Sequence, residues 1–202
     1  MCNNFFSVGI TGGIGSGKSL ICKIFLVLGV PVYSSDERAK WLLSHDDLLK
    51  RQIIQQFGKE AYNQGGELNR SYLAKTIFTD EEKRLQLNAL VHPRVGEDFR
   101  KWREAHKASP YALKEAALLF ETGSYKQLDK IINVSAPEAL RIQRVLLRDT
   151  HRSKEQLEAI MQKQWSDKQR EDLANFTINN DERKLMLPKV LKIHKQLVKI
   201  SS

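Results

Sequence analysis

A run of eight residues near the amino terminus carries the clearest chemistry in this chain of 202 residues. Residues 12–19 match the pattern G-x-x-x-x-G-K-[ST], the Walker A phosphate loop. Glycines let such a loop curl until its N–H groups face phosphate oxygens, and the positive end of a following helix faces the same anion. We expect the nucleotide-binding residues to be Gly13, Ile14, Gly15, Ser16, Gly17, Lys18, Ser19 and Leu20.

Two side chains at the end of this loop have predicted roles of their own. Lys18 is expected to neutralise charge on the β- and γ-phosphates, and the Ser19 hydroxyl is expected to ligate Mg²⁺. An apolar run over residues 5–10 predicts a buried strand, and apolar residues recur at helical spacing over residues 20–28. Strand, glycine loop and helix are the setting that the motif requires, so we prefer a nucleoside triphosphate site to a chance glycine-rich turn.

The remaining elements must hold this loop in place. Five apolar segments that alternate with helical patterns predict a parallel sheet with helices on both faces. The sequence therefore predicts an α/β fold, a three-layer P-loop NTPase core with a five-stranded parallel sheet, whose ligand lies beyond the carboxyl ends of the strands. The predicted strands are residues 5–10, 30–33, 111–120, 131–134 and 176–178.

Two segments between the strands are too long or too polar to be simple crossovers. Residues 37–107 predict an inserted helical domain for the acceptor substrate, and residues 145–169 predict a helical lid. The rest forms the nucleotide-binding core, at residues 1–36, 108–144 and 170–202.

Capping residues and prolines predict where the helices of these segments begin and end. Asn69 and Asp80 are plausible N-caps, and Ser153 with Gln156 fits a capping box. Pro93 is expected to end one helix, with a second running from residue 94 to residue 106.

The net charge of +9 has two interpretations, a nucleic-acid surface or a site for two phosphate-rich small molecules. Four lysines on one side of the last helix resemble an outer surface more than a groove-binding element, so we expect no nucleic-acid partner. No apolar run approaches the ~18 residues of a membrane span, so no membrane partner is expected. Cys2 and Cys22, the two cysteines, and the lack of a signal-peptide pattern indicate a cytoplasmic location. The oligomeric state stays open.

The rest of the chain favours a small-molecule kinase over other phosphate-loop proteins. No N-K-x-D pattern follows to bind guanine, and no D-x-x-G pattern supplies a switch aspartate. A helical insertion can hold an acceptor, and arginines after the fourth strand can close over the phosphoryl group. Arg144 and Arg148 stand one helical turn apart, so both project from one face. The alternative for these two arginines is a solvated helix face, since Arg141 and Arg152 lie nearby.

Asp36, just after the second strand, is the residue that we expect to activate the acceptor. Its carboxylate can accept a hydroxyl proton or orient that hydroxyl for in-line attack. It can also cap the helix predicted from Glu37, and the two roles are compatible.

A set of motifs resembles the dephospho-CoA kinase family, which is similar in fold to the nucleoside monophosphate kinases. The matching segments, in the family's order, are residues 11–19, 34–36, 68–70 with Leu73, 91–93, 118–121, Arg144 with 148–149, Gln164 and 178–180. The resemblance implies transfer of a phosphoryl group from ATP, with Mg²⁺, to the ribose 3′-hydroxyl of dephospho-CoA. Other readings are a related nucleoside or nucleoside monophosphate kinase, or a nucleotide-dependent regulator.

The resemblance also implies roles for four further residues. Arg70 and His92 match family positions that contact the acceptor substrate. The alternative for Arg70 is an ion pair with Glu67 at a helix start, and the alternative for His92 is a backbone contact at a helix end. Glu121 stands where a Walker B acid would end the third strand, and it is expected to hold Mg²⁺ through water or to bind a substrate hydroxyl. The alternative is a cap or ion pair at a strand end. Asn180 follows the last strand, where the fold class places its adenine-binding loop.

Three positions depart from the family's pattern. Ser34 replaces the first acid of an Asp-x-Asp pair, which places a second-carboxylate role in doubt and leaves Asp36 intact. Leu20 stands where threonine often follows the Walker serine, and Asn175 stands where the family tends to have aspartate.

Overall fold

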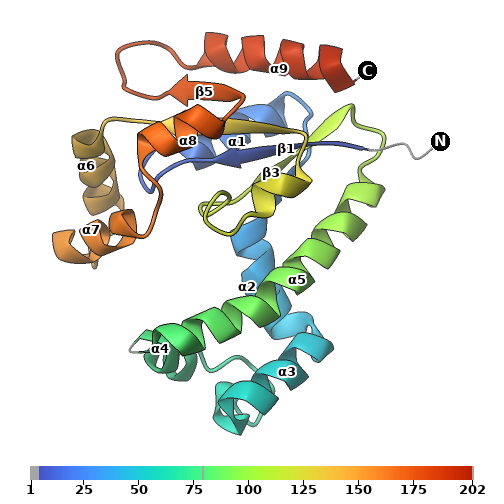
Figure 1. Cartoon of the computed structure of the whole chain (residues 1–202), viewed down its shortest axis with the longest axis vertical. Helices are drawn as coiled ribbons and strands as arrows, with labels where there is room; N and C mark the ends of the chain where they lie inside the picture. Colours follow the sequence, from blue (N-terminus) through green and yellow to red (C-terminus); the bar gives the residue numbers. More distant parts are fainter. Residues whose placement is uncertain (1–4, 79, 202) are drawn as a thin grey trace. The chain divides into compact units, whose positions relative to one another are not determined.

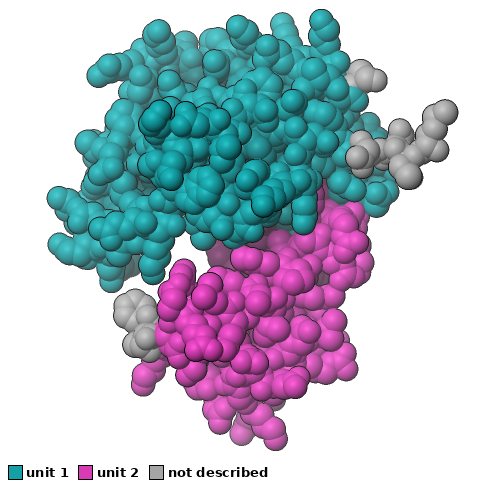
Figure 2. All heavy atoms as spheres, viewed as in Figure 1, with its two compact units in different colours: residues 1–34, 103–202 teal, residues 35–102 magenta. Residues whose placement is uncertain are grey.

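The computed structural model describes residues 5–78 and 80–201, so Cys2 lies outside the described residues. The chain divides into two compact units (Figure 2). The core unit comprises Met1–Ser34 and Arg103–Ser202, and the helical unit comprises Ser35–Trp102. Residues 145–169 belong to the core unit, and their role as a lid stays a prediction.

The core unit contains a sheet of five strands in the order β2-β3-β1-β4-β5 (Figure 1). Every neighbouring pair is parallel, which confirms the predicted sheet. The central strand β1 therefore has a neighbour on each side, and its carboxyl end delivers the glycine loop between them. The strands are β1 (Phe6–Thr11), β2 (Val32–Ser34), β3 (Tyr111–Glu115), β4 (Lys130–Ser135) and β5 (Phe176–Asn179).

Alternate residues of β1 face two apolar layers. On one face Val8 and Ile10 pack in a core with α1 (Lys18–Val27) and α9 (Leu187–Ser201). On the other face, a methyl group built on Gly9 would lie 2.6 Å from Leu119 Cδ2, so the covering segment packs directly on the strand. That second layer includes α8 (Asp167–Leu173), which contacts β4.

Three further helices of the core unit lie among the described residues. Helix α6 (Glu138–Arg148) follows β4, α7 (Lys154–Gln162) opens with the predicted capping box, and the 3-10 helix η2 (Ser124–Gln127) precedes β4. In that box Ser153 Oγ accepts from the Gln156 N–H, and the Gln156 side chain accepts from the Ser153 N–H. The α7 boundary is thus fixed by local hydrogen bonds.

The helical unit is built from α2 (Ser35–His45), α3 (Asp47–Phe57), η1 (Lys59–Ala61), α4 (Arg70–Phe78) and most of α5 (Glu81–Ala105). Leu42, Leu49 and Ile53 are buried within it. The predicted caps are confirmed: Asn69 Oδ1 accepts from the Tyr72 N–H at 3.2 Å, and Asp80 Oδ1 accepts from the Lys83 N–H at 3.1 Å.

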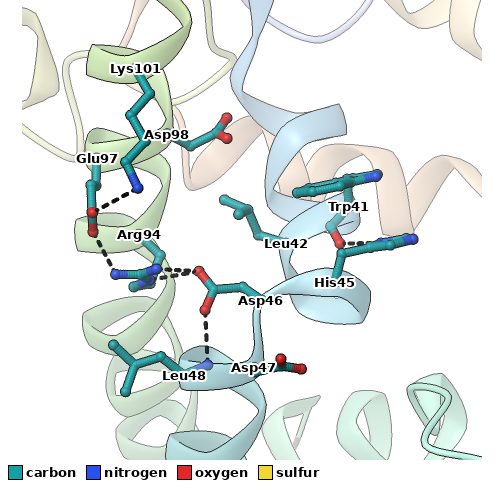
Figure 3. A pocket seen from close by; sticks show the side chains of 10 residues that line it. All are labelled: Trp41, Leu42, His45, Asp46, Asp47, Leu48, Arg94, Glu97, Asp98 and Lys101. Carbon is teal, nitrogen blue, oxygen red and sulfur yellow. Dashed lines mark hydrogen bonds and ion pairs between the residues drawn. The ribbon is translucent and has the colours of Figure 1, made fainter.

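A hollow of about 400 Å³ lies within the helical unit, beside α2, α3 and α5 (Figure 3). Five of its charged lining residues form ion pairs. Asp46 caps α3 and accepts from Arg94 Nε at 2.7 Å, while Glu97 forms ion pairs with Arg94 and Lys101. Asp98 pairs with Arg38 at 2.6 Å. These ion pairs tie the three helices together at the rim of the hollow.

Two predicted boundaries are wrong. Pro93 does not end a helix, because α5 runs through it from Glu81 to Ala105. Burial of Val91 and Val95 on either side of the proline holds the helix together despite the hydrogen bond that it loses. The third strand ends at Glu115 and not at residue 120. Leu119 and Phe120 are buried from a turn that covers the sheet, so their burial imitates a strand.

No helix in the described residues has the length and apolar character needed to cross a bilayer.

Replacement of Phe25 tests the importance of the α1–sheet core. Phe25 is fully buried, so Phe25→Ala removes a ring and leaves a cavity, and we expect the free energy of unfolding to fall by about 3–5 kcal/mol. Val27 in the same helix is 87% exposed, and Val27→Ala should change that free energy by less than about 1 kcal/mol. Urea unfolding at equilibrium measures both. Equal effects of the two substitutions would contradict the packing described here.

Candidate nucleotide and phosphoryl-transfer site

The glycine loop joins the end of β1 to the start of α1, and two of its glycines are required by their surroundings. A methyl group on Gly12 would lie 2.3 Å from the Val134 carbonyl oxygen of β4. Gly17, the N-cap of α1, has a φ of 89°, in the left-handed region that side chains disfavour. The loop is therefore closely packed on its β4 side, and it leads the chain directly into the amino end of a helix, which is a favourable place for an anion.

Asn180 and Arg144 lie against this loop. Asn180 is 5% exposed, and its Nδ2 donates to the Ser16 carbonyl oxygen at 2.9 Å. Arg144 Nη2 donates to the Asn180 carbonyl oxygen at 3.1 Å, and Nη1 donates to the Gly15 carbonyl oxygen at 3.4 Å. Arg144 also pairs with Glu182 at 2.8 Å. The loop that follows β5 is thereby joined to the phosphate loop.

Glu115, at the end of β3, is the partner of the loop lysine, and the sequence analysis missed it. Its carboxylate forms an ion pair with Lys18, and the two side chains are 12% and 11% exposed. Burial by itself would raise the pKa of Glu115, but the charge of Lys18 and hydrogen bonds from Lys18 and Ser34 hold that pKa below its ordinary value. The parallel register sets Ser34 directly opposite Glu115. The sequence did contain a signal for this pair, because Glu115 is an acidic residue on the strand next to β1.

Glu121 does not end a strand, which corrects its predicted place. It lies in the turn after β3, six residues beyond Glu115. Its Oε1 accepts from the Trp165 N–H at 2.7 Å, and its Oε2 is buried with no hydrogen-bond partner among the described residues. The acid that occupies the strand end is Glu115, because β3 stops five residues earlier than the apolar run suggested.

The arginines of α6 differ from one another in burial. Arg148 is 65% exposed and pairs with its neighbour Asp149 at 3.0 Å. Arg141, whose nearness supported the solvated-face alternative for Arg144 and Arg148, is itself only 5% exposed. Arg170 of α8 is 1% exposed. A methyl group built on Gly13 would lie 2.1 Å from Arg141 Nη1 and 3.0 Å from Arg170 Nη2, so these two arginines lie at the loop.

Three predicted substrate residues belong to the helical unit. Asp36 is the second residue of α2, so it lies in the first turn of that helix and is not its cap. Arg70 is the first residue of α4, and His92 lies within α5 beside Pro93. All three side chains are exposed. Glu67, the alternative partner of Arg70, accepts from Asn63 Nδ2 at 2.9 Å.

The metal prediction concerns Ser19, the second residue of α1, which is exposed. Among residues 5–78 and 80–201, no group of three or more His, Cys, Asp or Glu side chains is arranged to hold a metal ion. Cys22 of α1 is buried, and burial raises the pKa of its thiol to about 12, which favours a neutral, packed side chain.

A glycine loop between the central strand and the first helix of a parallel 2-3-1-4-5 sheet defines a P-loop nucleotide-binding protein. Its lysine, held by an acid on the neighbouring strand, and its surrounding arginines suit phosphoryl transfer. The chain belongs to the dephospho-CoA kinase family, whose sequence model matches residues 6–185.

Individual relatives agree with this assignment. A dephospho-CoA kinase of Bacteroides fragilis is 38% identical over 186 residues, which cover 92% of this chain and 90% of the relative. One from Porphyromonas gingivalis is 37% identical over 93% of this chain and 92% of the relative. Among solved structures, TT1252 of Thermus thermophilus is 28% identical, with a TM-score of 0.79 over 98% of each chain. The dephospho-CoA kinase of Campylobacter jejuni has the same fold, with a TM-score of 0.71 at 24% identity over 97% of this chain and 98% of the other.

Glu115→Gln tests the ion pair that holds Lys18. Because the pKa of Glu115 is depressed in the folded protein, its contribution to stability is complete above the ordinary carboxyl value of 4.5 and is lost as the pH falls through the lower folded value. We expect the variant to be less stable than the wild type at pH 7, with the difference closing at pH values below 4.5. Thermal unfolding across this range measures it. Glu171→Gln, at an exposed position, is the control; a pH-independent gap for Glu115→Gln would contradict the pair.

Proposed function

We propose that this chain is an ATP-dependent kinase that phosphorylates the ribose 3′-hydroxyl of dephospho-CoA and so completes coenzyme A. The observation that carries the proposal is the phosphate loop that ends in Lys18, together with the family match over residues 6–185. In the reaction the bond between the γ-phosphorus and the β–γ bridging oxygen breaks, and a bond from the γ-phosphorus to the 3′-oxygen forms. The hydroxyl proton leaves to a base, and ADP is the other product.

The core unit neutralises the phosphates. The amides of the loop and the amino end of α1 hold the oxygens nearest the helix, and Lys18 exchanges part of its contact with Glu115 for the β- and γ-phosphates. Arg144, already bonded to the loop and to the Asn180 segment, supports the nucleotide side. Asn180 borders the adenine. The arrangement works through positioning and charge, which is what phosphoryl transfer demands.

Magnesium fits the proposed reaction through Ser19. Its exposed hydroxyl follows Lys18 at the start of α1, and a serine oxygen with phosphate and water oxygens is the hard donor set that Mg²⁺ prefers. When bound, the ion would neutralise charge on the β- and γ-phosphates.

The helical unit supplies the acceptor side in this proposal. Asp36, two residues beyond the end of β2, accepts the proton of the 3′-hydroxyl or orients that hydroxyl for attack. Arg70 binds a phosphate of dephospho-CoA, while His92 and Glu121 contact the substrate. Arg148 and the segment of residues 145–169 close over the transferring group as a lid. A cytoplasmic location is part of the same proposal.

An acceptor panel tests the proposed substrate. Dephospho-CoA, nucleosides, nucleoside monophosphates and a polynucleotide are each supplied in a separate reaction with ATP. We expect only dephospho-CoA to stimulate the release of ADP. A coupled assay for ADP measures the rates, and mass analysis of the product locates the phosphate on the ribose. Lys18→Ala should abolish the signal, because the β- and γ-phosphates then lose the ammonium group that neutralises them during transfer. Stimulation by a nucleoside monophosphate or by a polynucleotide instead would replace the proposed acceptor.

Asp36→Asn tests the assignment of the base. The amide keeps the size of the side chain but cannot take the proton, so we expect kcat to fall by about 10²–10⁴-fold. Affinity for ATP, measured by calorimetry, should stay near that of the wild type. Glu37→Gln alters the exposed neighbouring acid of the same helical turn and should leave kcat unchanged. Turnover of Asp36→Asn at the wild-type rate would remove Asp36 from the mechanism.

A further inference from the structure

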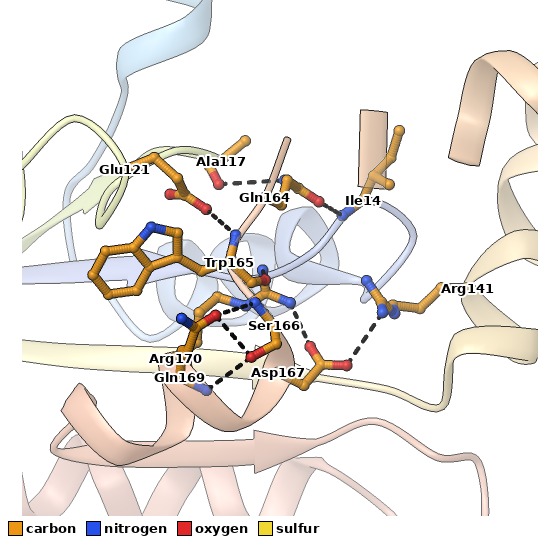
Figure 4. A network of polar contacts seen from close by, with 10 residues as sticks. All are labelled: Ile14, Ala117, Glu121, Arg141, Gln164, Trp165, Ser166, Asp167, Gln169 and Arg170. Carbon is orange, nitrogen blue, oxygen red and sulfur yellow. Dashed lines mark hydrogen bonds and ion pairs between the residues drawn. The ribbon is translucent and has the colours of Figure 1, made fainter. Parts of the chain in front are cut away.

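Arg141 of α6 and Arg170 of α8 meet at a single carboxylate (Figure 4). Asp167 Oδ2 accepts from Arg141 Nη2 at 3.2 Å, and Asp167 Oδ1 accepts from Arg170 Nη2. The two arginine side chains are only 6% and 2% exposed, whereas that of Asp167 is 32% exposed. Two buried guanidinium groups thus share one partly exposed counter-charge.

This arginine pair lies against the opening half of the phosphate loop. The space where a side chain at Gly13 would begin is occupied by the two guanidinium groups, at 2.1 Å for Arg141 and 3.0 Å for Arg170. Ile14, the next loop residue, is contacted by the segment just before α8. Gln164 Oε1 accepts from the Ile14 N–H at 2.9 Å (Figure 4). Lys18 and the amino end of α1 belong to the other half of the loop.

The arginine pair has donors to spare. A guanidinium has five N–H donors, and the hydrogen bonds in the described residues use one from Arg141 and two from Arg170, the second to the Trp165 carbonyl oxygen. Both Nε atoms are buried without a partner. Glu121, the other acid of the network, accepts from the Trp165 N–H and forms no ion pair with either arginine in the described structure. Buried cations with unfilled donors are costly, and phosphate oxygens are acceptors that match their geometry.

We propose that Arg141 and Arg170 bind the terminal phosphoryl group of ATP, an inference that rests on the kinase function proposed above. The second half of the loop and α1 cradle the phosphates nearest the helix, so a triphosphate that extends along the loop presents its far end at Gly13 and Ile14. The arginines that the sequence favoured have other contacts in the described structure. Arg144 is bonded to Asn180 and Glu182, and Arg148 is largely exposed beside Asp149.

Nucleotide titrations of the full chain test this assignment. Calorimetry with ATP and with ADP is carried out on the wild type, Arg141→Gln and Arg170→Gln. Because only ATP carries the terminal group, we expect each substitution to weaken ATP by about tenfold or more and ADP by less than about threefold. Lys168→Gln is the matched control on α8, since Lys168 is 87% exposed; it should alter neither affinity.

A purely structural arginine pair would give a different result. It predicts that the glutamine variants melt at lower temperature while their ATP-to-ADP affinity ratio stays within twofold of the wild type, and that result would overturn the proposal. If a glutamine variant does not fold, Arg141→Lys and Arg170→Lys keep the charge beside Asp167 and lose the planar fork. The same selective loss of ATP affinity is expected from them, and an unchanged ratio counts against the assignment. A wild type that binds ATP without phosphorylating dephospho-CoA would refute the proposed acceptor alone.

Discussion

The phosphates of a nucleotide concentrate negative charge, and the phosphate loop must hold its N–H groups in fixed positions to bind them. The structure of the core unit follows from this need for a rigid loop. The loop that carries Gly12 is closely packed against β4, and Asn180 ties its middle to the segment after β5. Both supports come from the strands on one side of β1. A loop held by its own sheet can present amides and the end of α1 without reorganising when an anion arrives.

Some cationic side chains around the loop have an acidic partner of their own, but two arginines share one. Lys18 is matched by Glu115, which keeps a buried ammonium group compensated beside the cradle. Arg144 is matched by Glu182. Arg141 and Arg170 share Asp167 and keep unused donors. A site with its surplus donors on one wall favours a ligand whose greatest charge density meets that wall, which is the end of a triphosphate.

Much of this fold was predictable because the signals are local. The glycine motif, the helical spacing after it and the caps at Asn69 and Asp80 depend on residues within one or two turns of each other. The third strand was extended too far because Leu119 and Phe120 are buried from a turn, and an apolar run does not distinguish the two kinds of burial. The α5 helix continues through Pro93 because packing outweighs the local penalty.

The sequence by itself determined the phosphate loop, the parallel α/β sheet and the family, because each of these depends on particular residue types at fixed spacing. Only the tertiary structure decided that Glu115, and not Glu121, ends the third strand beside Lys18, and that Arg141 and Arg170 lie at Gly13. Those neighbours come from segments 97 residues apart in the case of Lys18 and Glu115. Their meeting depends on where β3 stops and how α6 and α8 pack, which are properties of the whole core and of no single motif.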